Sequence, residues 1–243
     1  MDTSQQRLAG RLALVTGATR GIGRAVALAY AREGAHLILV GRTAGALEEL
    51  DDEIRALGAG ATLLTLDLKR HDKIDALGPT IYQRWQKLDI LVGNAGILGP
   101  LTPLGHLTAD AWDEVLAVNL TANWRLIRTL DPLLRASDAG RAIFVSSGAA
   151  VRPRAYWGPY AVSKAALEAL VRTYADEVAN TSVRANLVNP GPTRTRMRAQ
   201  AFPGEDPATL QAPEDLAATF VRLAEPSCTD NGRLFDLRSG EVG

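Results

Sequence analysis

The chain has little cysteine, histidine and aromatic content, and it has no long apolar run. Its 243 residues include one cysteine, Cys228, so no disulfide can form within the chain. The three histidines, His36, His71 and His106, lie far apart, and we expect no metal site. No apolar run approaches the roughly 20 residues that cross a bilayer, and the start, MDTSQQRLAGR, lacks the apolar stretch of a signal peptide. These absences predict a cytoplasmic protein that does not enter membranes.

The chain also lacks an excess of charge of either sign. Its 27 lysines and arginines balance its 27 aspartates and glutamates. A protein that binds DNA, RNA or an anionic membrane over a wide surface usually carries a clear basic excess. We therefore expect no nucleic-acid or membrane partner and look for a small-molecule ligand.

Short apolar runs alternate with longer amphipathic segments along the whole chain. The amphipathic segments carry apolar residues at spacings of three and four, which is typical of helices packed on one face. Parallel strands need such helical crossovers, and buried parallel strands read as continuous apolar runs. The pattern predicts a single α/β domain over residues 1–243, a Rossmann fold with a doubly wound, mostly parallel seven-stranded sheet and helices on both faces. The expected strands are 11–16, 36–40, 61–66, 88–92, 141–146, 182–188 and 233–237.

A glycine-rich turn separates the first expected strand from the first expected helix. Glycines let the backbone turn tightly and approach a ligand, and the helix N-terminus offers free N–H groups to a pyrophosphate. The spacing departs from the usual G-x-G-x-x-G pattern, and a tight turn without a ligand also fits. The turn is Thr16-Gly17-Ala18-Thr19-Arg20-Gly21-Ile22-Gly23.

Arg42 follows the second expected strand, where a dinucleotide-binding site often places an acid on the ribose hydroxyl. A guanidinium at this position pairs with a 2′-phosphate instead, and Arg20 in the glycine turn supplies a second positive charge. The alternative is a solvated loop charge. We expect NADP(H) rather than NAD(H) as the cofactor.

Tyr160 and Lys164 lie four residues apart in the segment PYAVSK. Four residues is close to one turn at about 3.6 residues per turn, so both side chains leave a helix on the same face. A cation beside a phenol favours the phenolate and lowers the pKa of the phenol. The spacing alone fits a proton-transfer unit, but it also fits a half-buried aromatic beside a solvated amine.

A hydroxyl for the same site comes from the end of the fifth expected strand. Ser147 precedes Tyr160 by thirteen residues, and Ser146 competes with it for this role. Neighbouring side chains of a strand point to opposite faces, so only one of the two serines can face the pocket. The chain has no G-x-S-x-G motif and no nearby histidine or acid for a nucleophilic triad, which favours a polarising hydroxyl.

Three further segments carry polar or small residues where they can reach a ligand. Asp67-Leu68 and Asn94-Ala95-Gly96 follow the third and fourth expected strands, and an Asp there can accept a hydrogen bond from an adenine amine. Asn119 lies on the apolar stripe of a helix that begins after the capping residue Thr108. A buried amide needs partners, so Asn119 either ties its helix to the sheet or holds water near an active site.

Taken in order, these residues resemble the short-chain dehydrogenase/reductase family in its shorter branch, and they are similar to its 3-oxoacyl-[acyl-carrier-protein] reductase type. The resemblance runs from TGATRGIG to Pro190-Gly191. It implies that Ser147 orients a substrate carbonyl, Tyr160 transfers a proton, Lys164 lowers the pKa of Tyr160 and holds the nicotinamide ribose, and Asn119 serves a proton relay. It implies cofactor contacts from Thr16, Gly17, Thr19, Arg20, Gly21, Ile22, Gly23, Arg42, Asp67, Leu68, Asn94, Ala95, Gly96, Tyr160, Lys164, Pro190, Gly191, Thr193 and Thr195.

The chain departs from the family pattern at two places. Gly93 stands where many relatives have a second Asn, and we expect this to loosen the turn without changing the chemistry. The resemblance implies a mobile substrate lid at about 191–212, and here the lid carries Arg194, Arg196 and Arg198. Either these arginines accept an anionic substrate, such as a coenzyme A or carrier-bound acyl thioester, or they are solvated charges. The expected substrate pocket combines Leu98, Ser147, Trp157, Tyr160 and Arg196.

The residues and the resemblance together predict an NADP(H)-dependent oxidoreductase. It would reduce a ketone or a 3-oxoacyl thioester to an alcohol, or run the reverse reaction. The alternative is a non-catalytic NADP(H)-binding sensor or scaffold of the same fold. A nucleotide-sugar epimerase or dehydratase is disfavoured because no separate substrate domain follows residue 190. By resemblance, we expect a homotetramer or homodimer.

Overall fold

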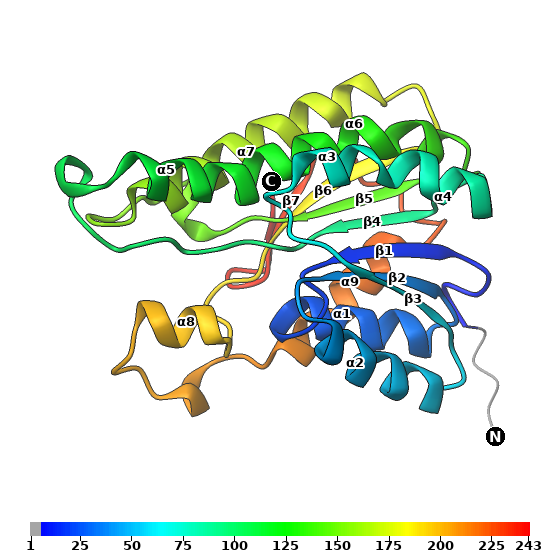
Figure 1. Cartoon of the computed structure of the whole chain (residues 1–243), viewed down its shortest axis with the longest axis horizontal. Coiled ribbons are helices and arrows are strands. Elements are labelled where there is room, and N and C mark those ends of the chain that lie inside the picture. Colours follow the sequence, from blue (N-terminus) through cyan, green and yellow to red (C-terminus); the bar gives the residue numbers. More distant parts are fainter. Residues whose placement is uncertain (1–5) are drawn as a thin grey trace.

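A mostly parallel sheet runs through the middle of the molecule (Figure 1). The computed structural model describes residues 6–243. The strand order is β3-β2-β1-β4-β5-β6-β7-β8, which is the doubly wound order of a Rossmann fold with two strands, β7 and β8, added at the edge. The strands are β1 (Leu12–Thr16), β2 (His36–Gly41), β3 (Ala61–Thr65), β4 (Ile90–Gly93), β5 (Arg141–Val145), β6 (Arg184–Asn189), β7 (Leu234–Asp236) and β8 (Glu241–Val242).

The helices form one layer on each face of the sheet, as the alternating pattern predicts. In Figure 1, α1 (Gly21–Arg32), α2 (Ala44–Ala56) and α9 (Ala217–Ala224) lie on the lower face. The upper face carries α3 (His71–Asp75), α4 (Leu77–Trp85), α6 (Ala122–Arg135) and α7 (Gly158–Glu177), with α5 (Ala109–Leu116) toward the left. The short α8 (Arg196–Ala201) lies apart, beyond the carboxyl ends of the strands. A single α/β domain is confirmed.

The sheet has one strand more than the seven that the sequence predicts. β8 pairs antiparallel with β7, with Asp236 opposite Glu241 and Phe235 opposite Val242. Two residues are too few to produce an apolar run or an alternation. The strand forms because the turn at Gly240, with φ of +76°, folds the chain back onto the sheet edge.

Two expected helices are interrupted in the structure. The helix that carries Ile74 and Trp85 is divided into α3 and α4, because Pro79 has no N–H to donate to the Asp75 carbonyl. The Thr129 hydroxyl donates to that carbonyl instead and accepts from the Gly78 amide. Thr108 caps α5 as predicted, accepting a hydrogen bond from the Ala111 amide at 3.3 Å. The helix then passes through a π-turn at Ala117–Thr121 before α6. Such π-turns are frequent at functional sites.

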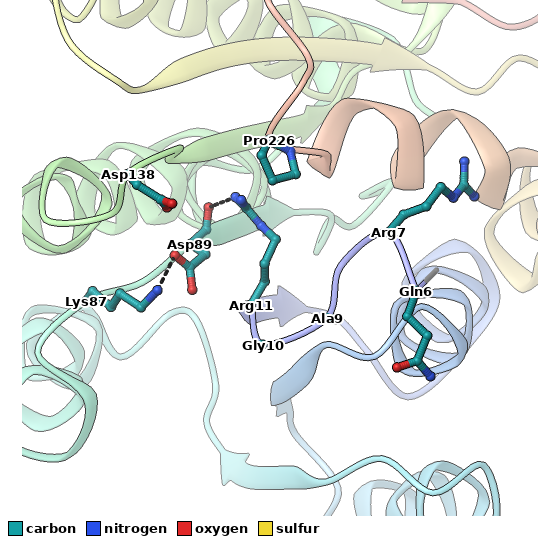
Figure 2. Close-up of a pocket in the computed structure, with 9 residues that line it drawn as sticks. All are labelled: Gln6, Arg7, Ala9, Gly10, Arg11, Lys87, Asp89, Asp138 and Pro226. Carbon is teal, nitrogen blue, oxygen red and sulfur yellow. Dashed lines mark hydrogen bonds and ion pairs between the residues drawn. The ribbon is translucent and has the colours of Figure 1, made fainter. Parts of the chain in front are cut away.

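A buried polar network closes the sheet at its amino end, opposite the carboxyl ends of the strands. Figure 2 shows it beside a cavity of about 440 Å³. The Arg11 guanidinium donates to the carbonyl oxygens of Asp89 and Ala139. The Asp89 carboxylate accepts from Lys87 at 2.9 Å, from the Leu12 amide at 2.9 Å and from the Ser137 hydroxyl at 2.6 Å. These bonds tie β1, β4 and the segment before β5 together.

The Asp89 network predicts a pH-dependent loss of stability. Burial disfavours the ionised carboxylate, but hydrogen bonds from Ser137, the Leu12 amide and Lys87 outweigh burial and hold the pKa of Asp89 below its ordinary value. The stabilisation is therefore present above the unfolded pKa of about 3.9 and is lost as the pH falls through the lower folded value. Asp89→Asn should lower the free energy of unfolding by about 2 kcal/mol at pH 7.

Urea unfolding between pH 3 and pH 7 tests this prediction. The difference between wild type and Asp89→Asn should shrink as the pH falls, because the wild-type carboxylate becomes protonated. The exposed Asp52→Asn, in the interior of α2, is the control and should track wild type throughout. If the free energies of unfolding of wild type and Asp89→Asn differ by the same amount at all pH values, the role assigned to the Asp89 charge is contradicted.

Candidate active site

Ser147 and Tyr160 meet where β5 ends and α7 begins. Ser146 is not available, because its hydroxyl is buried and donates to Glu168 at 2.6 Å. The next side chain, Ser147, is partly buried, and its hydroxyl accepts from the Ala149 amide at 3.2 Å. Ser147 acts to lower the pKa of Tyr160, as a hydroxyl beside the phenol does. Glu168, two turns beyond Tyr160 on α7, thus engages the Ser146 hydroxyl and leaves Ser147 as the serine available to Tyr160.

Lys164 lies one turn beyond Tyr160 on α7, on the same face. Its ammonium lies 5.9 Å from the centre of the Tyr160 ring and donates to the Val145 carbonyl at 2.7 Å, at the end of β5. Burial lowers the pKa of Lys164 to about 8. The Lys164 side chain is 3% exposed, and burial together with its hydrogen bond to the end of the strand holds it in one place.

The pKa of Tyr160 differs from the expectation. Burial raises the pKa of Tyr160 above its ordinary value, and the hydrogen bond with Ser147 only partly opposes this. The expected lowering by Lys164 is not seen, because the ammonium is turned to the Val145 carbonyl rather than to the phenol oxygen. In this structure Tyr160 is therefore a neutral phenol, the form that can donate a proton.

Asn119 lies in the π-turn and is fully buried. Its amide oxygen accepts from the Ile97 N–H at 2.8 Å, and its amide nitrogen donates to the Ile97 carbonyl at 2.9 Å and to Ser163 at 3.0 Å. The Ser163 hydroxyl in turn donates to the Tyr160 carbonyl at 2.8 Å. The Asn119 side chain thus ties its helix to the turn after β4 and to α7, which is one of the two roles that the sequence leaves open.

The glycine turn packs against the turn after β4 at the switch point of the sheet, between β1 and β4. The Thr16 hydroxyl accepts from the amides of Asn94 at 3.0 Å and Ala95 at 3.1 Å, and the Asn94 side chain donates to the Thr16 carbonyl. A Cβ on Gly23 would lie 2.3 Å from the Gly17 carbonyl oxygen, so only glycine fits there.

The start of α1 is open to an anion. The helix has no side-chain cap and no acidic residue in its first turn, so its first N–H groups have no partner from a capping side chain. Arg20 immediately precedes the helix, and its side chain is exposed. Ile22 and Thr19 are partly buried beside it. This geometry matches the phosphate-binding role that the sequence predicts for the turn.

Arg42 lies just beyond β2 and is exposed. Among residues 6–243, no hydrogen bond or ion pair engages the guanidinium of Arg20 or of Arg42, whereas nearby Lys69 is paired with Glu114 at 2.9 Å. Asp67 follows β3 and accepts from the Lys69 amide at 3.0 Å, and Leu68 beside it is buried. Two free arginines therefore flank the region where an adenine ribose would lie in this fold.

The segment 191–212 returns to the glycine turn from the other side. A Cβ on Gly21 would lie 3.3 Å from the Thr195 methyl group, so the two segments are in contact. The Thr195 hydroxyl caps α8 by accepting from the Arg198 amide, and the Thr193 hydroxyl donates to the carbonyls of Pro190 and Gly191. Both hydroxyls thus shape the segment.

Aromatic side chains connect this segment to Tyr160. The Trp157 ring meets the Tyr160 ring edge-on at 5.8 Å and the Phe202 ring at 5.6 Å. Arg198 stacks on Phe202 at 3.8 Å and makes a two-point ion pair with Glu205 at 2.5 and 2.6 Å. Trp157 therefore lies beside Tyr160. Leu98 is buried and follows Ile97 in the chain.

The chain matches the family model described as short chain dehydrogenase over residues 11–206. It is 39% identical to the Escherichia coli K12 protein named "Uncharacterized oxidoreductase YciK", over 97% of this chain and 95% of that protein. This chain belongs to the short chain dehydrogenase family. A short chain dehydrogenase from Shigella flexneri, solved in complex with NADP, has a TM-score of 0.92 and 38% identity, covering 97% of this chain and 100% of that one. An Escherichia coli relative solved in complex with NADPH has a TM-score of 0.91 and 39% identity. The match covers 96% of this chain and 98% of that one.

This short chain dehydrogenase differs from its expected form at Gly93. A Cβ there would lie 2.3 Å from the Phe144 ring and 2.6 Å from the Asn123 amide oxygen. The expectation that Gly93 loosens the turn is wrong, because Phe144 and Asn123 fill the place of the missing side chain. Gly93 is required by its neighbours.

Sequence reasoning missed Phe202, Glu205 and Asn123. Phe202 and Glu205 follow a helix of six residues, too short for a periodic signal. Glu205 lies seven residues after Arg198, a spacing that indicates a pair only once the chain is known to fold back there. Asn123 lies four residues after Asn119, and this repeat of an amide on a buried stripe was the available signal.

No described helix of this short chain dehydrogenase, within residues 6–243, is both long and apolar enough to cross a membrane. In the same part of the chain, no group of three or more His, Cys, Asp or Glu side chains comes together as a metal site would require.

Proposed function

We propose that this chain is an NADP(H)-dependent reductase that converts a ketone or a 3-oxoacyl thioester to an alcohol, or catalyses the reverse oxidation. The observation that carries the proposal is a buried, neutral phenol, Tyr160, beside Ser147 and the buried cation of Lys164. This set lies at the carboxyl ends of β4 and β5, next to an open helix N-terminus.

The residues around the glycine turn fit NADP(H). The uncapped start of α1 suits a pyrophosphate, and the close packing at Gly17, Gly21 and Gly23 leaves backbone rather than side chains facing it. Arg20 and Arg42 carry free guanidinium groups that suit a 2′-phosphate. Relatives of 38% and 39% identity were solved with NADP and NADPH, which supports the same cofactor here. We assign the remaining contacts to Asp67, Leu68, Asn94, Ala95, Gly96, Pro190, Thr193 and Thr195.

The chain's own residues handle the oxygen of the substrate. When bound, the reduced nicotinamide supplies a hydride to the carbonyl carbon. Ser147 and Tyr160 donate hydrogen bonds to the carbonyl oxygen, and these strengthen as negative charge develops on it. Tyr160 passes its proton to that oxygen, which completes the alcohol and leaves a phenolate beside Lys164. The Lys164 cation then stabilises the phenolate, and a proton from water restores the phenol.

Lys164 can assist Tyr160 although it leaves the resting pKa high. Its ammonium is held near the ring by the Val145 carbonyl, and a negative phenolate would draw it closer. Its effect is therefore greater on the charged state that forms during reaction than on the resting phenol. This is the difference between ground state and transition state that catalysis requires.

The substrate side combines apolar walls with free positive charge. We propose that 191–212 is a lid, that Leu98 and Trp157 belong to the pocket wall, and that Phe202 joins them. Arg198 is already neutralised by Glu205, so it is not available to an anionic substrate. Arg194 and Arg196 are exposed and remain the candidates for contact with a carboxylate, a phosphate or an acidic carrier.

A carbonyl and alcohol screen tests the proposed function. Purified protein is mixed with NADPH, and in parallel with NADH, and absorbance of the reduced nicotinamide is followed with neutral ketones, carboxylate-bearing ketones and 3-oxoacyl thioesters. We expect turnover of at least one class with NADPH. Tight NADPH binding without turnover of any carbonyl or alcohol would instead indicate a non-catalytic NADP(H)-binding sensor or scaffold.

We also propose assembly into a homotetramer or homodimer. The helices that carry Asn119 and Tyr160 expose apolar side chains on their outer faces, with Trp124 43% exposed on α6 and Val162 45% exposed on α7. Light scattering should give two or four times the 25.9 kDa chain mass. A monomer at micromolar concentration would contradict this assignment.

A further inference from the structure

Glu168 is a carboxylate buried on the face of α7 that packs against the sheet. It lies between Leu167 and Val171 and is 5% exposed. Glutamate is almost never fully buried unless it is paired, so its partners should explain its place. One carboxylate oxygen accepts from the Ser146 hydroxyl at 2.6 Å, and the other lies 3.3 Å from the Arg172 guanidinium, one turn further along the helix. The proposed reaction makes no use of this carboxylate.

Glu168 and Lys164 lie one turn apart on α7, and they hold neighbouring residues at the end of β5. Lys164 donates to the Val145 carbonyl at 2.7 Å, and Glu168 accepts from the side chain of the next residue, Ser146. The Ser146 amide is itself held by the Val188 carbonyl of β6 at 2.8 Å. Two bonds that are one helical turn, or about 5.4 Å, apart fix both the position and the rotation of the helix at the strand end. We call this pair of contacts the β5–α7 clamp.

The two hydroxyls of the candidate site lie on opposite sides of the β5–α7 clamp. Ser147 follows Ser146 directly in the chain, and Tyr160 lies one turn before Lys164 on α7. The chain between the two hydroxyls runs through the exposed residues 151–156, whereas the clamp is buried. The distance between the Ser147 and Tyr160 hydroxyls therefore depends on how the clamp holds α7 against the end of β5.

We propose that Glu168 is a positioning residue that sets the distance between Ser147 and Tyr160 by holding Ser146. This inference rests on the proposed reductase function. In this scheme Glu168 touches neither substrate nor cofactor, and it acts through Ser146 on the serine that follows. The carbonyl oxygen accepts from both hydroxyls in the transition state, so a small displacement of Ser147 lowers kcat. Loss of Glu168 should leave NADPH affinity unchanged, because the glycine turn lies between β1 and α1, away from this contact.

Three variants separate the contact with Ser146 from the charge of Glu168. Glu168→Met removes the acceptor and keeps a side chain of similar length, and we expect kcat to fall by about tenfold, less than the 10²–10⁴-fold typical of losing the proton-transferring group itself. Glu168→Gln keeps an oxygen that can accept from Ser146, so it should recover most of the lost kcat. Arg172→Met removes the ion pair and leaves the Ser146 contact in place, so it is the matched control and should keep the wild-type kcat.

A double variant separates positioning from stability. Ser146→Ala leaves the Glu168 carboxylate buried without its donor, so it should lower both thermal stability and kcat. Ser146→Ala combined with Glu168→Met removes both partners and should regain part of the stability, because neither partner is then left buried and unpaired. The kcat of the double variant should stay at the level of Glu168→Met, because two changes that remove one contact do not add. Thermal unfolding, steady-state kinetics and NADPH binding by fluorescence measure these quantities.

The outcomes distinguish this inference from the proposed function. Wild-type kcat in Glu168→Met, or an equal loss of kcat in Glu168→Gln or Arg172→Met, would overturn the positioning role while the reductase stands. So would a kcat that recovers together with stability in the double variant. Should Glu168→Met fail to fold, the comparison of the double variant with Glu168→Gln carries the test. Absence of turnover by the wild-type protein in the carbonyl screen would overturn both.

Discussion

Tyr160→Phe is expected to lower kcat by about 10²–10⁴-fold, because the substitution removes the group that donates the proton to the carbonyl oxygen. The ring keeps its contact with Trp157, so the site should remain folded. Loss of the Tyr160 hydroxyl leaves Ser147 as the single remaining donor of the proposed pair. NADPH affinity should change little, since the phosphate-binding elements lie on α1 and near Arg42.

Steady-state kinetics on the best carbonyl from the screen, with NADPH binding followed by fluorescence, measure this effect. Tyr174→Phe is the matched control. Tyr174 is a buried tyrosine on the same helix, and its hydroxyl donates to Asp131 at 2.8 Å, outside the Ser147 contact. The Tyr174→Phe variant should keep the wild-type kcat even if the protein becomes less stable. Unchanged turnover in Tyr160→Phe would refute the assignment of the proton donor.

The sheet could be predicted from the sequence because buried parallel strands are continuous apolar runs. HLILV at 36–40 and LDILV at 88–92 become parts of β2 and β4, both buried. The same logic fails for β8, where two residues at an edge carry no pattern. At the division between α3 and α4 the apolar spacing continues, and the local signal of the break is Pro79, which cannot donate to the Asp75 carbonyl. The replacement bonds come from Thr129 on another helix, which no local pattern indicates.

In the candidate site, too, some features follow from residues close together in the sequence, and others depend on contacts with residues far away in the sequence. Tyr160 and Lys164 share a face because helical spacing alone places them there. The alternation of a strand shows that one of Ser146 and Ser147 faces the pocket, but it does not show which, since the answer depends on Glu168 from α7. Whether Arg198 is free to contact an anion likewise depends on Glu205, which the fold of the 191–212 segment brings within contact.

At Gly93 the local sequence predicts a looser turn, and the structure shows the opposite. Read alone, a glycine in a turn indicates a looser backbone. In the structure the Phe144 ring and the Asn123 amide occupy the space beside it, so the turn is tightly packed. Both neighbours come from other elements, β5 and α6, and no local pattern around residue 93 indicates them.

Arg42→Ala should weaken NADPH binding by about 10- to 100-fold and leave NADH binding unchanged, because a charge-assisted hydrogen bond to a phosphate contributes about 1.5–3 kcal/mol. NADPH and NADH differ only in the 2′-phosphate, so the comparison isolates that group. Arg42→Asp should weaken NADPH binding more than Arg42→Ala does. Its carboxylate repels the 2′-phosphate and can accept from the free ribose hydroxyls of NADH, which should move the preference toward NADH.

The effect of Arg42 should depend on ionic strength. The guanidinium is exposed, so added salt screens its attraction for the phosphate, and the gap between wild type and Arg42→Ala should narrow between 0.05 and 0.5 M salt, as a Debye length of about 8 Å at 0.15 M implies. Arg32→Ala, an exposed arginine in the last turn of α1, is the matched control and should retain the wild-type ratio of NADPH to NADH affinity. A wild-type preference for NADH, or an Arg42→Ala variant that binds both cofactors as wild type does, would remove Arg42 from the 2′-phosphate site and leave Arg20 as the remaining candidate.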